Sequence, residues 1–376
     1  MEYKRLGDIA SYINGYAFKP EQRGSEGLPI IRIQDLTGNA YDLGFYDGDY
    51  PKKIEINDGD VLISWSASLG VYIWNRGKAL LNQHIFKVSF DKAEVDKEYF
   101  VFAVKHKLAE MVSKTHGATM KHIVKKDFDN TKVPFPSLEK QAEIATVLSK
   151  VSSVIDARQA ELQKLDDLIK ARFVELFGTI YDNKYGFEIK TIQDVCEQIK
   201  DGTHQTPTYT DDTKNGFKFL SSKDVTTGKI DWSKIKYIPA DLHEELYKRI
   251  KPQKGDILLA KNGTTGVAAI VETDEVFDIY VSLALLRPIE MNSVYLWAAV
   301  NSVETKRQFD GNLKGIGVPN LHLGEIKKTQ ILVPPIELQE QFADFVKQVD
   351  KSKVVVQEAL DKAQLLFDSL MQEYFG

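Results

Sequence analysis

Cysteine is almost absent from this chain, since Cys196 stands alone among 376 residues. One cysteine excludes an internal disulfide or a thiolate zinc cluster, and it is typical of proteins in a reducing compartment. No apolar run approaches the roughly 18–20 residues that cross a bilayer. The opening "MEYKRLGDIASYI" lacks the apolar core of a signal peptide. These absences predict a cytoplasmic protein.

The familiar signatures of catalysis are also missing. Gly263-Thr264-Thr265-Gly266 lacks the spacing and the lysine of a P-loop, and Pro334-Pro335 is followed by Ile336, so no amino-methyltransferase motif occurs. The seven histidines form no H-x-x-x-H pair, and no metal site is predicted. Asp182, Glu188 and Lys190 loosely imitate a nuclease D…E-x-K arrangement. The sequence therefore favours a binding protein that is not an enzyme, with a nuclease as the alternative.

The overall charge of the chain does not favour nucleic-acid binding. The net charge is −5, and the segment 335–376 has eight acidic residues against four basic ones. Away from that segment the charges nearly balance. A DNA-binding surface would therefore have to be a local basic patch.

The sequence contains the same phrases twice. "FPSLEKQAEIATVLSKV" begins at Phe135 and "VPPIELQEQFADFVKQV" begins at Val333, 198 residues later. The ungapped match extends to "VELFG" and "QEYFG" at 174–178 and 372–376. Further back, "GDVLI" (59–63) matches "GDILL" (255–259), and "LGDI" (6–9) matches "IQDV" (192–195). The chain is therefore predicted to be a tandem duplication of a unit of roughly 180–200 residues, with insertions in loops.

Each repeat ends in a segment that is predicted to be one long helix. Neither 137–177 nor 336–375 contains proline or glycine. Apolar residues recur at heptad spacing, which is typical of a coiled-coil seam. Forty helical residues make a rod of about 60 Å. Arg158 and Lys353 fall on this stripe, where they either extend to solvent or fix the helix register.

The rest of each repeat is predicted to be globular and α/β. Strand-like phrases are "DVLISW", "GVYIW", "DILLA", "GVAAIV" and "QILV", which are rich in β-branched and aromatic residues. One amphipathic helix is expected in each copy, over 96–112 and 293–309. The predicted organisation has globular domains at 1–136 and 179–334, with helices at 137–178 and 335–376.

These residues resemble the DNA-specificity subunit of Type I restriction–modification systems. The features in common are the "LGDI" opening, the "GDIL…G" strand–loop–strand, the "P-x-[LI]-E-x-Q" start of a long helix, the phrase "DGTHQTPTY" (201–209) and the duplication itself. The resemblance covers the whole chain. The first copy departs from it, because "INGYAFKP" (13–20) stands where a "DGTH" phrase is expected.

The resemblance implies two mixed-sheet target-recognition domains joined by two long helices that pair as an antiparallel coiled coil with pseudo-two-fold symmetry. Each domain would read one half of an asymmetric bipartite site in double-stranded DNA. The helices would set the spacing and dock two methyltransferase subunits, and restriction subunits would join them. The chain itself would hold no cofactor, since S-adenosylmethionine, Mg and ATP belong to the partner subunits.

Polar loops and basic clusters supply the candidate DNA contacts. The loops after the two "GD[VI]L[IL]" strands, "SWSASLG" and "AKNGTTG", and the "DGTH" phrase carry side chains that suit base edges or phosphates. Basic clusters at 119–128 and 306–314 suit phosphate contacts. The candidates are Trp65, Ser66, Ser68, Lys121, His122, Lys125, His204, Gln205, Thr206, Lys261, Asn262, Thr264 and Lys314. Ordinary polar turns and solvated basic faces are the competing interpretation.

The long helices supply the candidate partner surface. We expect partner subunits to dock on the helices around Leu148, Ile155, Leu162, Val349, Val356 and Leu360. A third hypothesis treats the chain as a coiled-coil adaptor whose globular ends bind proteins. Sequence-dependent, salt-sensitive DNA affinity of the assembled complex would distinguish DNA recognition from that adaptor role.

Overall fold

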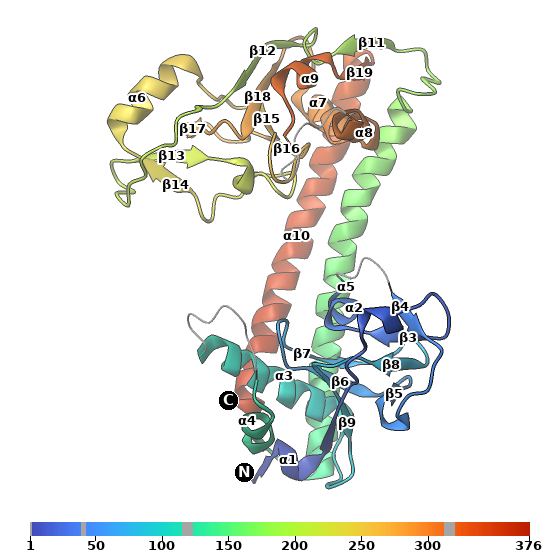
Figure 1. Ribbon diagram of the computed structural model, residues 1–376. Coiled ribbons are helices and arrows are strands. Elements are labelled where there is room, and N and C mark those ends of the chain that lie inside the picture. Colours follow the sequence, from blue (N-terminus) through green and yellow to red (C-terminus); the bar gives the residue numbers. More distant parts are fainter. Residues whose placement is uncertain (1, 39–42, 115–122, 312–319) are drawn as a thin grey trace. The chain divides into compact units, whose positions relative to one another are not determined.

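A computed structural model describes residues 2–38, 43–114, 123–311 and 320–376. The chain divides into two compact units (Figure 1). The first unit consists of residues 1–159 and 357–376, and the second consists of residues 160–356. Within the described ranges, no helix combines the length and the apolar character that a membrane span requires.

The first unit contains two four-stranded sheets and a two-stranded one. Their strand orders are β2-β9-β6-β7, β4-β3-β8-β5 and β1-β10. Most neighbours are antiparallel, but β3 and β8 run parallel, so the second of these sheets is mixed. The strands are β1 (Tyr3–Arg5), β2 (Ser11–Asn14), β3 (Leu28–Ile31), β4 (Gly44–Tyr46), β5 (Glu55–Ile56), β6 (Val61–Ser64), β7 (Gly70–Ile73), β8 (Ala79–Leu81), β9 (Ile85–Ser89) and β10 (Lys132–Pro134).

The second unit repeats this topology. Its sheet orders are β12-β18-β15-β16, β14-β13-β17 and β11-β19, and β13 runs parallel to β17. Each strand has a counterpart at the same place in the first unit, where β5 is an addition. The strands are β11 (Glu188–Thr191), β12 (Cys196–Asp201), β13 (Phe217–Leu220), β14 (Lys236–Ile238), β15 (Ile257–Ala260), β16 (Ala268–Ile270), β17 (Phe277–Ile279), β18 (Leu283–Pro288) and β19 (Gln330–Val333). The predicted mixed-sheet duplication is confirmed.

Helices flank the sheets of both units. Those of the first are α1 (Leu6–Ile9), α2 (Ile33–Thr37), α3 (Lys97–Lys114) and α4 (Lys125–Asn130), with short 3-10 turns at Pro20–Gln22 and Lys52–Ile54. Those of the second are α6 (Ala240–Arg249), α7 (Ser293–Val300), α8 (Val303–Gly311) and α9 (Leu323–Lys328), with a 3-10 turn at Ser222–Asp224.

The prediction of a single helix over 293–309 was wrong, because α7 and α8 are separate. The Asn301 side chain bonds both the N–H and the C=O of Ala268 on β16, each at 3.0 Å. This contact ties the end of α7 to the sheet. The Ser302 hydroxyl then accepts the backbone N–H of Thr305 at 3.2 Å and starts α8.

The two long helices are α5 (Leu138–Phe177) and α10 (Ile336–Phe375). Each contributes to the core of both units. In the first unit, Leu148 and Ile155 of α5 pack with Phe367 and Phe375 of α10. In the second unit the opposite ends meet, since Ile169 and Phe177 pack with Phe342, Val346 and Val349. The N-terminal part of α5 therefore packs against the C-terminal part of α10, and the C-terminal part of α5 packs against the N-terminal part of α10, so the two helices are antiparallel. The predicted heptad stripe forms their buried interface.

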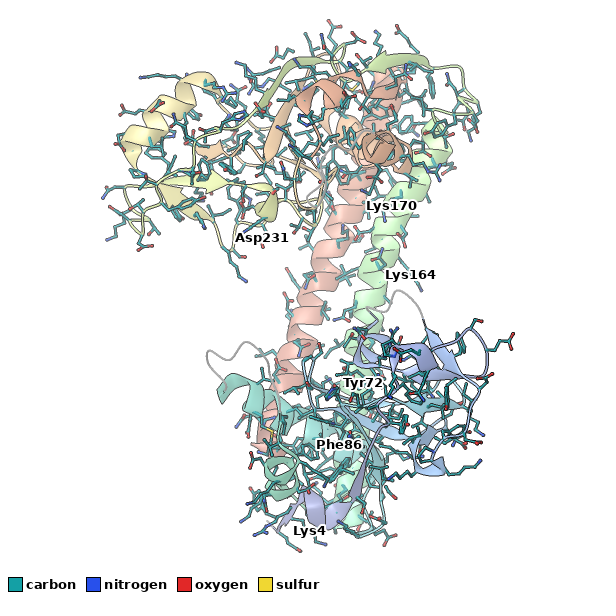
Figure 2. The ribbon with its side chains drawn as sticks, viewed as in Figure 1. Lys4, Tyr72, Phe86, Lys164, Lys170 and Asp231 are labelled. Carbon is teal, nitrogen blue, oxygen red and sulfur yellow. The ribbon has the colours of Figure 1, made fainter. Side chains whose placement is uncertain are left out.

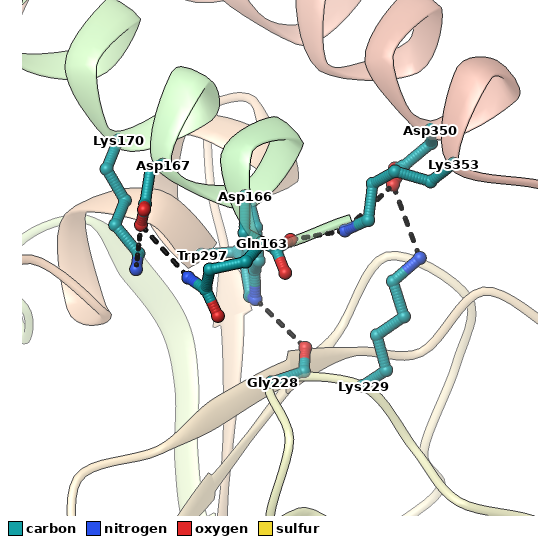
Figure 3. A network of polar contacts seen from close by, with 9 residues as sticks. All are labelled: Gln163, Asp166, Asp167, Lys170, Gly228, Lys229, Trp297, Asp350 and Lys353. Atoms are coloured by element: carbon teal, nitrogen blue, oxygen red, sulfur yellow. Dashed lines mark hydrogen bonds and ion pairs between the residues drawn. The ribbon is translucent and has the colours of Figure 1, made fainter. Parts of the chain in front are cut away.

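A polar network joins α5, α10 and the loop before β14 within the second unit (Figure 3). The Lys353 ammonium, predicted to lie on the stripe, forms ion pairs with Asp166 of α5 and with Asp350 of its own helix. Asp350 also pairs with Lys229 of the loop at 3.3 Å. Lys353 is mostly buried, so it bridges the two helices instead of extending freely into solvent.

The glutamine of the "P-x-[LI]-E-x-Q" motif is a buried clamp in both repeats. Gln141 donates to the Pro136 carbonyl at 2.8 Å and accepts the Asp96 N–H at 3.0 Å. Gln339 makes the equivalent bonds to Pro334 and Asn292 at the same distances. Both side chains are enclosed. The motif therefore fixes the start of α5 against the start of α3, and the start of α10 against the start of α7.

Two glycines allow the chain to cross close to a neighbouring backbone. A Cβ placed on Gly15 would lie 2.0 Å from the Asn82 carbonyl oxygen, and one on Gly202 would lie 2.0 Å from that of Ile279. No side chain fits at that distance. Gly15 of "INGY" and Gly202 of "DGTH" therefore occupy equivalent positions, although the phrases around them differ.

We predict that Gly202→Ala destabilises the second unit by about 3 kcal/mol or more, because backbone atoms cannot give way to the added methyl group. Gly324→Ala is the matched control, since the Cβ of residue 324 on α9 meets no atom within 4 Å. This control should be neutral or slightly stabilising. Urea unfolding of the two variants provides the measurement, and equal midpoints would contradict the close backbone approach at Gly202.

Candidate nucleic-acid interface

The β6–β7 loop of the first unit brings three predicted contact residues together. Ser68 is exposed, Ser66 is buried and Trp65 is half-buried. The Trp65 ring stacks on Phe86 with 5.5 Å between ring centroids, and Phe86 lies inside the unit (Figure 2). The Ser64 hydroxyl donates to the Ser68 carbonyl at 2.5 Å and holds the loop closed. Ser68 is therefore the member of this set whose side chain is open to a ligand.

The basic cluster at 119–128 is described in part. Lys125 is exposed on α4 and pairs with Asp129 at 2.6 Å. Its ammonium also lies over the Tyr12 ring. Lys121, His122 and Lys314 lie outside the described residues, so the structure reports nothing of them.

The equivalent loop of the second unit follows β15 and differs in character. Lys261 is buried, Asn262 is half-buried and Thr264 is exposed. Asn262 forms an isolated antiparallel bridge with Asn320. Only Thr264 of the three presents a largely open side chain.

Lys261 is buried because the fold brings it to Asp201, the first residue of the "DGTH" phrase. Their charged atoms lie 2.9 Å apart, and the Lys261 side chain is 7% exposed. The same carboxylate accepts a hydrogen bond from Arg249 at the end of α6 at 3.3 Å, and the Nε2 atom of His204 lies 3.3 Å from it. Three segments that are distant in sequence therefore meet at one carboxylate.

The charge balance at this junction sets the protonation state of Asp201. Burial by itself raises the pKa of the carboxyl group, but the hydrogen bond and the positive charge of Lys261, with His204 beside it, outweigh that effect. The pKa of Asp201 consequently lies below its ordinary value. The carboxylate is ionised at neutral pH and neutralises the buried Lys261.

His204, Gln205 and Thr206 follow Asp201 and are all exposed. The Gln205 N–H donates to the Thr203 hydroxyl at 3.2 Å, which gives the loop its local turn. Among the described candidates of the second unit, the open polar side chains are therefore His204, Gln205, Thr206 and Thr264, and His204 lies beside Asp201. Sequence reasoning missed Asp201 and Arg249. The four basic residues within 248–254 are the sequence feature that could have identified Arg249 as a candidate contact residue.

Backbone hydrogen bonds show which positions correspond in the polar loops of the two units. We call these loop positions the rim of each unit. Tyr16 donates to Leu81 and Thr203 donates to Ile279, while Trp65 donates to His84 and Lys261 donates to Ser282. It follows that Asn14 corresponds to Asp201, Trp65 to Lys261 and Ser66 to Asn262. Equivalent backbone positions therefore carry different chemistry.

The nuclease-like residues do not form a metal site. Glu188 pairs with Lys190 at 3.0 Å on β11, and Asp182 accepts the N–H of Lys184 at 2.9 Å. In the parts of the chain that the structure describes, no group of three His, Cys, Asp or Glu residues is placed to hold a metal ion. Burial raises the pKa of the Cys196 thiol to about 12, so the lone cysteine stays protonated.

The predicted partner residues lie in or beside the helix seam. Leu148, Ile155, Val349 and Val356 are buried, and Leu162 and Leu360 are half-buried. Apolar side chains that are open to solvent occupy other positions on the same helices: Val147, Val154, Leu168 and Val174 on α5, and Val354, Val355, Leu365 and Leu366 on α10.

Comparison with known proteins gives a consistent result. The family model for the Type I restriction modification DNA specificity domain matches residues 1–167 and 184–362. The chain is 25% identical to the Type I restriction enzyme EcoBI specificity subunit of Escherichia coli, over 98% of this chain and 84% of that protein. It is also 25% identical to the MjaVIII specificity subunit of Methanocaldococcus jannaschii, over 93% of this chain and 86% of that protein.

A solved structure has the same fold. The Type I restriction–modification S subunit from M. genitalium superposes with a TM-score of 0.55 at 14% identity, covering 100% of this chain and 96% of that chain. The duplicated topology and the two family-model matches thus define a protein with two DNA-specificity domains. The chain belongs to the Type I restriction modification DNA specificity family, and its function is that of a specificity subunit, which serves DNA recognition.

We predict that Asp201→Asn lowers the free energy of unfolding at pH 7 by about 2 kcal/mol, because the buried Lys261 ammonium loses its counter-ion. The folded-state pKa of Asp201 is depressed, so its contribution is complete above the unfolded-state pKa of about 3.9 and is lost as the pH falls through the folded-state value. The difference between wild type and variant should therefore shrink below about pH 4.

Urea unfolding between pH 3 and pH 8 measures this difference. Asp182→Asn is the control, since Asp182 is exposed in the same unit and makes a local turn contact that asparagine retains. A difference between Asp201→Asn and wild type that does not change with pH would contradict the charge argument.

Proposed function

We propose that the two units read the two halves of one asymmetric DNA site and that the chain itself catalyses no reaction. The observation that carries this proposal is the pair of equivalent rims with unlike side chains. One backbone frame presents Asn14, Trp65 and Ser66 in the first unit and Asp201, Lys261 and Asn262 in the second. Identical rims would favour a palindromic target, whereas unlike rims favour a bipartite target with two different halves.

The exposed polar rim supports direct contact with base edges or phosphates. Ser68 in the first unit, and His204, Gln205 and Thr264 in the second, are open to solvent next to backbone that is held by hydrogen bonds. Glutamine and the hydroxyl residues suit base edges, and a histidine or lysine suits a phosphate. Lys261 supports this readout from inside the unit, because its charge is already paired with Asp201.

The open apolar side chains on α5 and α10 support docking of two methyltransferase subunits, one on each unit. The first unit carries Val147 and Val154 with Leu365 and Leu366, and the second carries Leu168 and Val174 with Val354 and Val355. Apolar residues repeated along a helix surface fit a partner helix laid alongside. In the second unit, a groove of about 460 Å³ adjoins this face between α5 and α7.

The location follows from the partners. We infer that a subunit that reads DNA together with methyltransferase and restriction subunits works in the cytoplasm. The catalytic cofactors would be held by those partners.

Methylome sequencing of cells with and without this gene tests the DNA-reading proposal. We expect adenine methylation at one bipartite motif that disappears with the gene. Ser68→Ala should relax only one half of that motif and Thr264→Ala only the other, with a loss of about 1 kcal/mol of discrimination for each lost hydrogen bond. Methylation at the same positions in both strains would refute the proposal.

The isolated chain gives the corresponding biochemical test. With DNA, Mg²⁺ and S-adenosylmethionine it should neither cleave nor methylate. Cleavage that is lost on Glu188→Ala would instead support the nuclease. A complete complex with no sequence-dependent, salt-sensitive DNA affinity would support the protein adaptor.

Docking on the helices is tested by Val154→Glu, which places a charge on a position that is 47% exposed. We expect at least tenfold weaker binding of the methyltransferase subunit in calorimetry, since burying the carboxylate in an apolar contact is unfavourable. The thermal stability of the free chain should be unchanged.

Gln159→Glu is the matched control for this test. It adds the same charge to an exposed position on the same helix, about 140° around the axis from Val154. Equal methyltransferase affinity for the two variants would show that this apolar face is not the docking surface.

A further inference from the structure

The surface at the end of α6 concentrates positive charge in the second unit. Lys248, Arg249, Lys251 and Lys254 are exposed, and exposed Lys200 of β12 lies beside them, with its ammonium 3.3 Å from the Arg249 carbonyl. The acidic residues of α6, Asp241, Glu244 and Glu245, all precede its last turn. Over the described residues, no carboxylate is recorded within 4 Å of the Lys200, Lys248, Lys251 or Lys254 ammonium.

Capping of a helix C-terminus is the ordinary explanation for such cations. Lys200 fills that role here, since its ammonium, from another element, reaches the terminal carbonyl of α6. The Arg249 guanidinium instead turns toward the "DGTH" phrase. It donates to the Gly202 carbonyl at 3.2 Å and to Asp201 at 3.3 Å.

Arg249 retains the capacity to bind an anion. Its side chain is 49% exposed, and two of its five N–H donors are engaged by Gly202 and Asp201. Asp201 is shared with Lys261, so one negative charge faces two permanent positive ones. The junction therefore keeps a net positive charge at its open side, where His204 also lies.

In the described residues of the first unit, the equivalent segment forms no helix like α6. The segment between β4 and β6 contains only a 3-10 turn and β5 where the second unit has α6. Asn14 and Trp65 occupy the positions of Asp201 and Lys261, so the charged junction is also absent there. The feature belongs to one half of the molecule.

We propose that the end of α6, with Arg249 at its centre, binds the phosphate backbone beside the half-site read by the second unit, and that Asp201 is the positioning residue that fixes Arg249 and His204 there. The proposal rests on the proposed DNA-reading function and adds a site to it. Phosphate contacts of this kind set the register of a reading domain on DNA without carrying sequence information themselves.

The test uses the chain assembled with its methyltransferase subunits and a duplex that carries the bipartite motif from the methylome. We expect Arg249→Gln to raise the Kd about tenfold at 0.15 M salt and to reduce the slope of log K against log salt by about one. Arg249→Lys keeps the charge, so its slope should stay that of wild type while the Kd rises by a smaller factor.

Lys328→Gln is the control for Arg249→Gln. It removes one positive charge from exposed Lys328 on α9, which lies beside β19 and far from α6 within the same unit (Figure 1). We expect its Kd and salt slope to match those of wild type. Because Arg249 and Lys328 are both exposed, neither substitution changes the packing of the hydrophobic core.

Asp201 is tested by scanning single-base changes through both half-sites. Asp201→Asn, in complexes shown to be folded by their thermal transition, should lower discrimination in the second half-site at least fivefold and leave the first half-site unchanged.

Two failures are distinguishable. A wild-type complex with no bipartite specificity would overturn the proposed function itself. A specific wild-type complex in which Arg249→Gln and Lys328→Gln give the same Kd and salt slope would overturn the α6 site alone.

Discussion

Every part of the molecule depends on the burial of apolar side chains between α5 and α10. The helices are not spacers attached to finished domains, because their segments complete the cores. Phe367 and Phe375 of α10 lie in the core of the first unit, and Phe177 of α5 packs with Phe342 and Tyr295 in the second. A fully buried aromatic side chain of this size contributes about 2 kcal/mol or more through removal of apolar area from water. Removing either helix would therefore expose two cores.

Buried hydrogen bonds hold the first turn of each long helix in place, as apolar packing holds the interface between the helices. Gln141 and Gln339 satisfy a backbone carbonyl and a backbone N–H at the same place in both repeats. Tyr99 and Tyr295 donate to the carbonyls of Pro134 and Leu332 from equivalent positions. An unpaired polar group at such a buried place costs about 1–3 kcal/mol. These constraints account for the segments whose sequences are similar in the two repeats.

The rims are under no such constraint, and there the repeats diverge. Gly15 and Gly202 preserve the close backbone crossing, while the neighbouring positions hold asparagine in one unit and aspartate in the other. The scaffold tolerates this exchange because the side chains project from a backbone that is held by hydrogen bonds at equivalent positions of the two units. The two units share one backbone fold, but their rim side chains can differ independently. One chain can therefore present two different DNA-recognition surfaces.

Most of the architecture could be predicted from sequence, because it depends on local and periodic signals. The long helices follow from forty residues without proline or glycine and an apolar stripe at heptad spacing. The division between α7 and α8 could not be foreseen, since it depends on the bonds of Asn301 to a strand more than thirty residues earlier. The burial of Lys261 could not be foreseen either, because a lysine is buried only where the fold supplies a partner.

The sequence by itself determined the duplication, the two long helices, the α/β character of the globular parts and the family resemblance, since repeated phrases and hydrophobic periodicity are properties of the chain read in order. Tertiary structure alone decided which polar side chains meet. Asp201, Arg249 and Lys261 are separated by up to 60 residues in sequence, yet they share one carboxylate. The physical reason is that an ion pair depends on distance in space, and that distance is set by the packing of the whole unit.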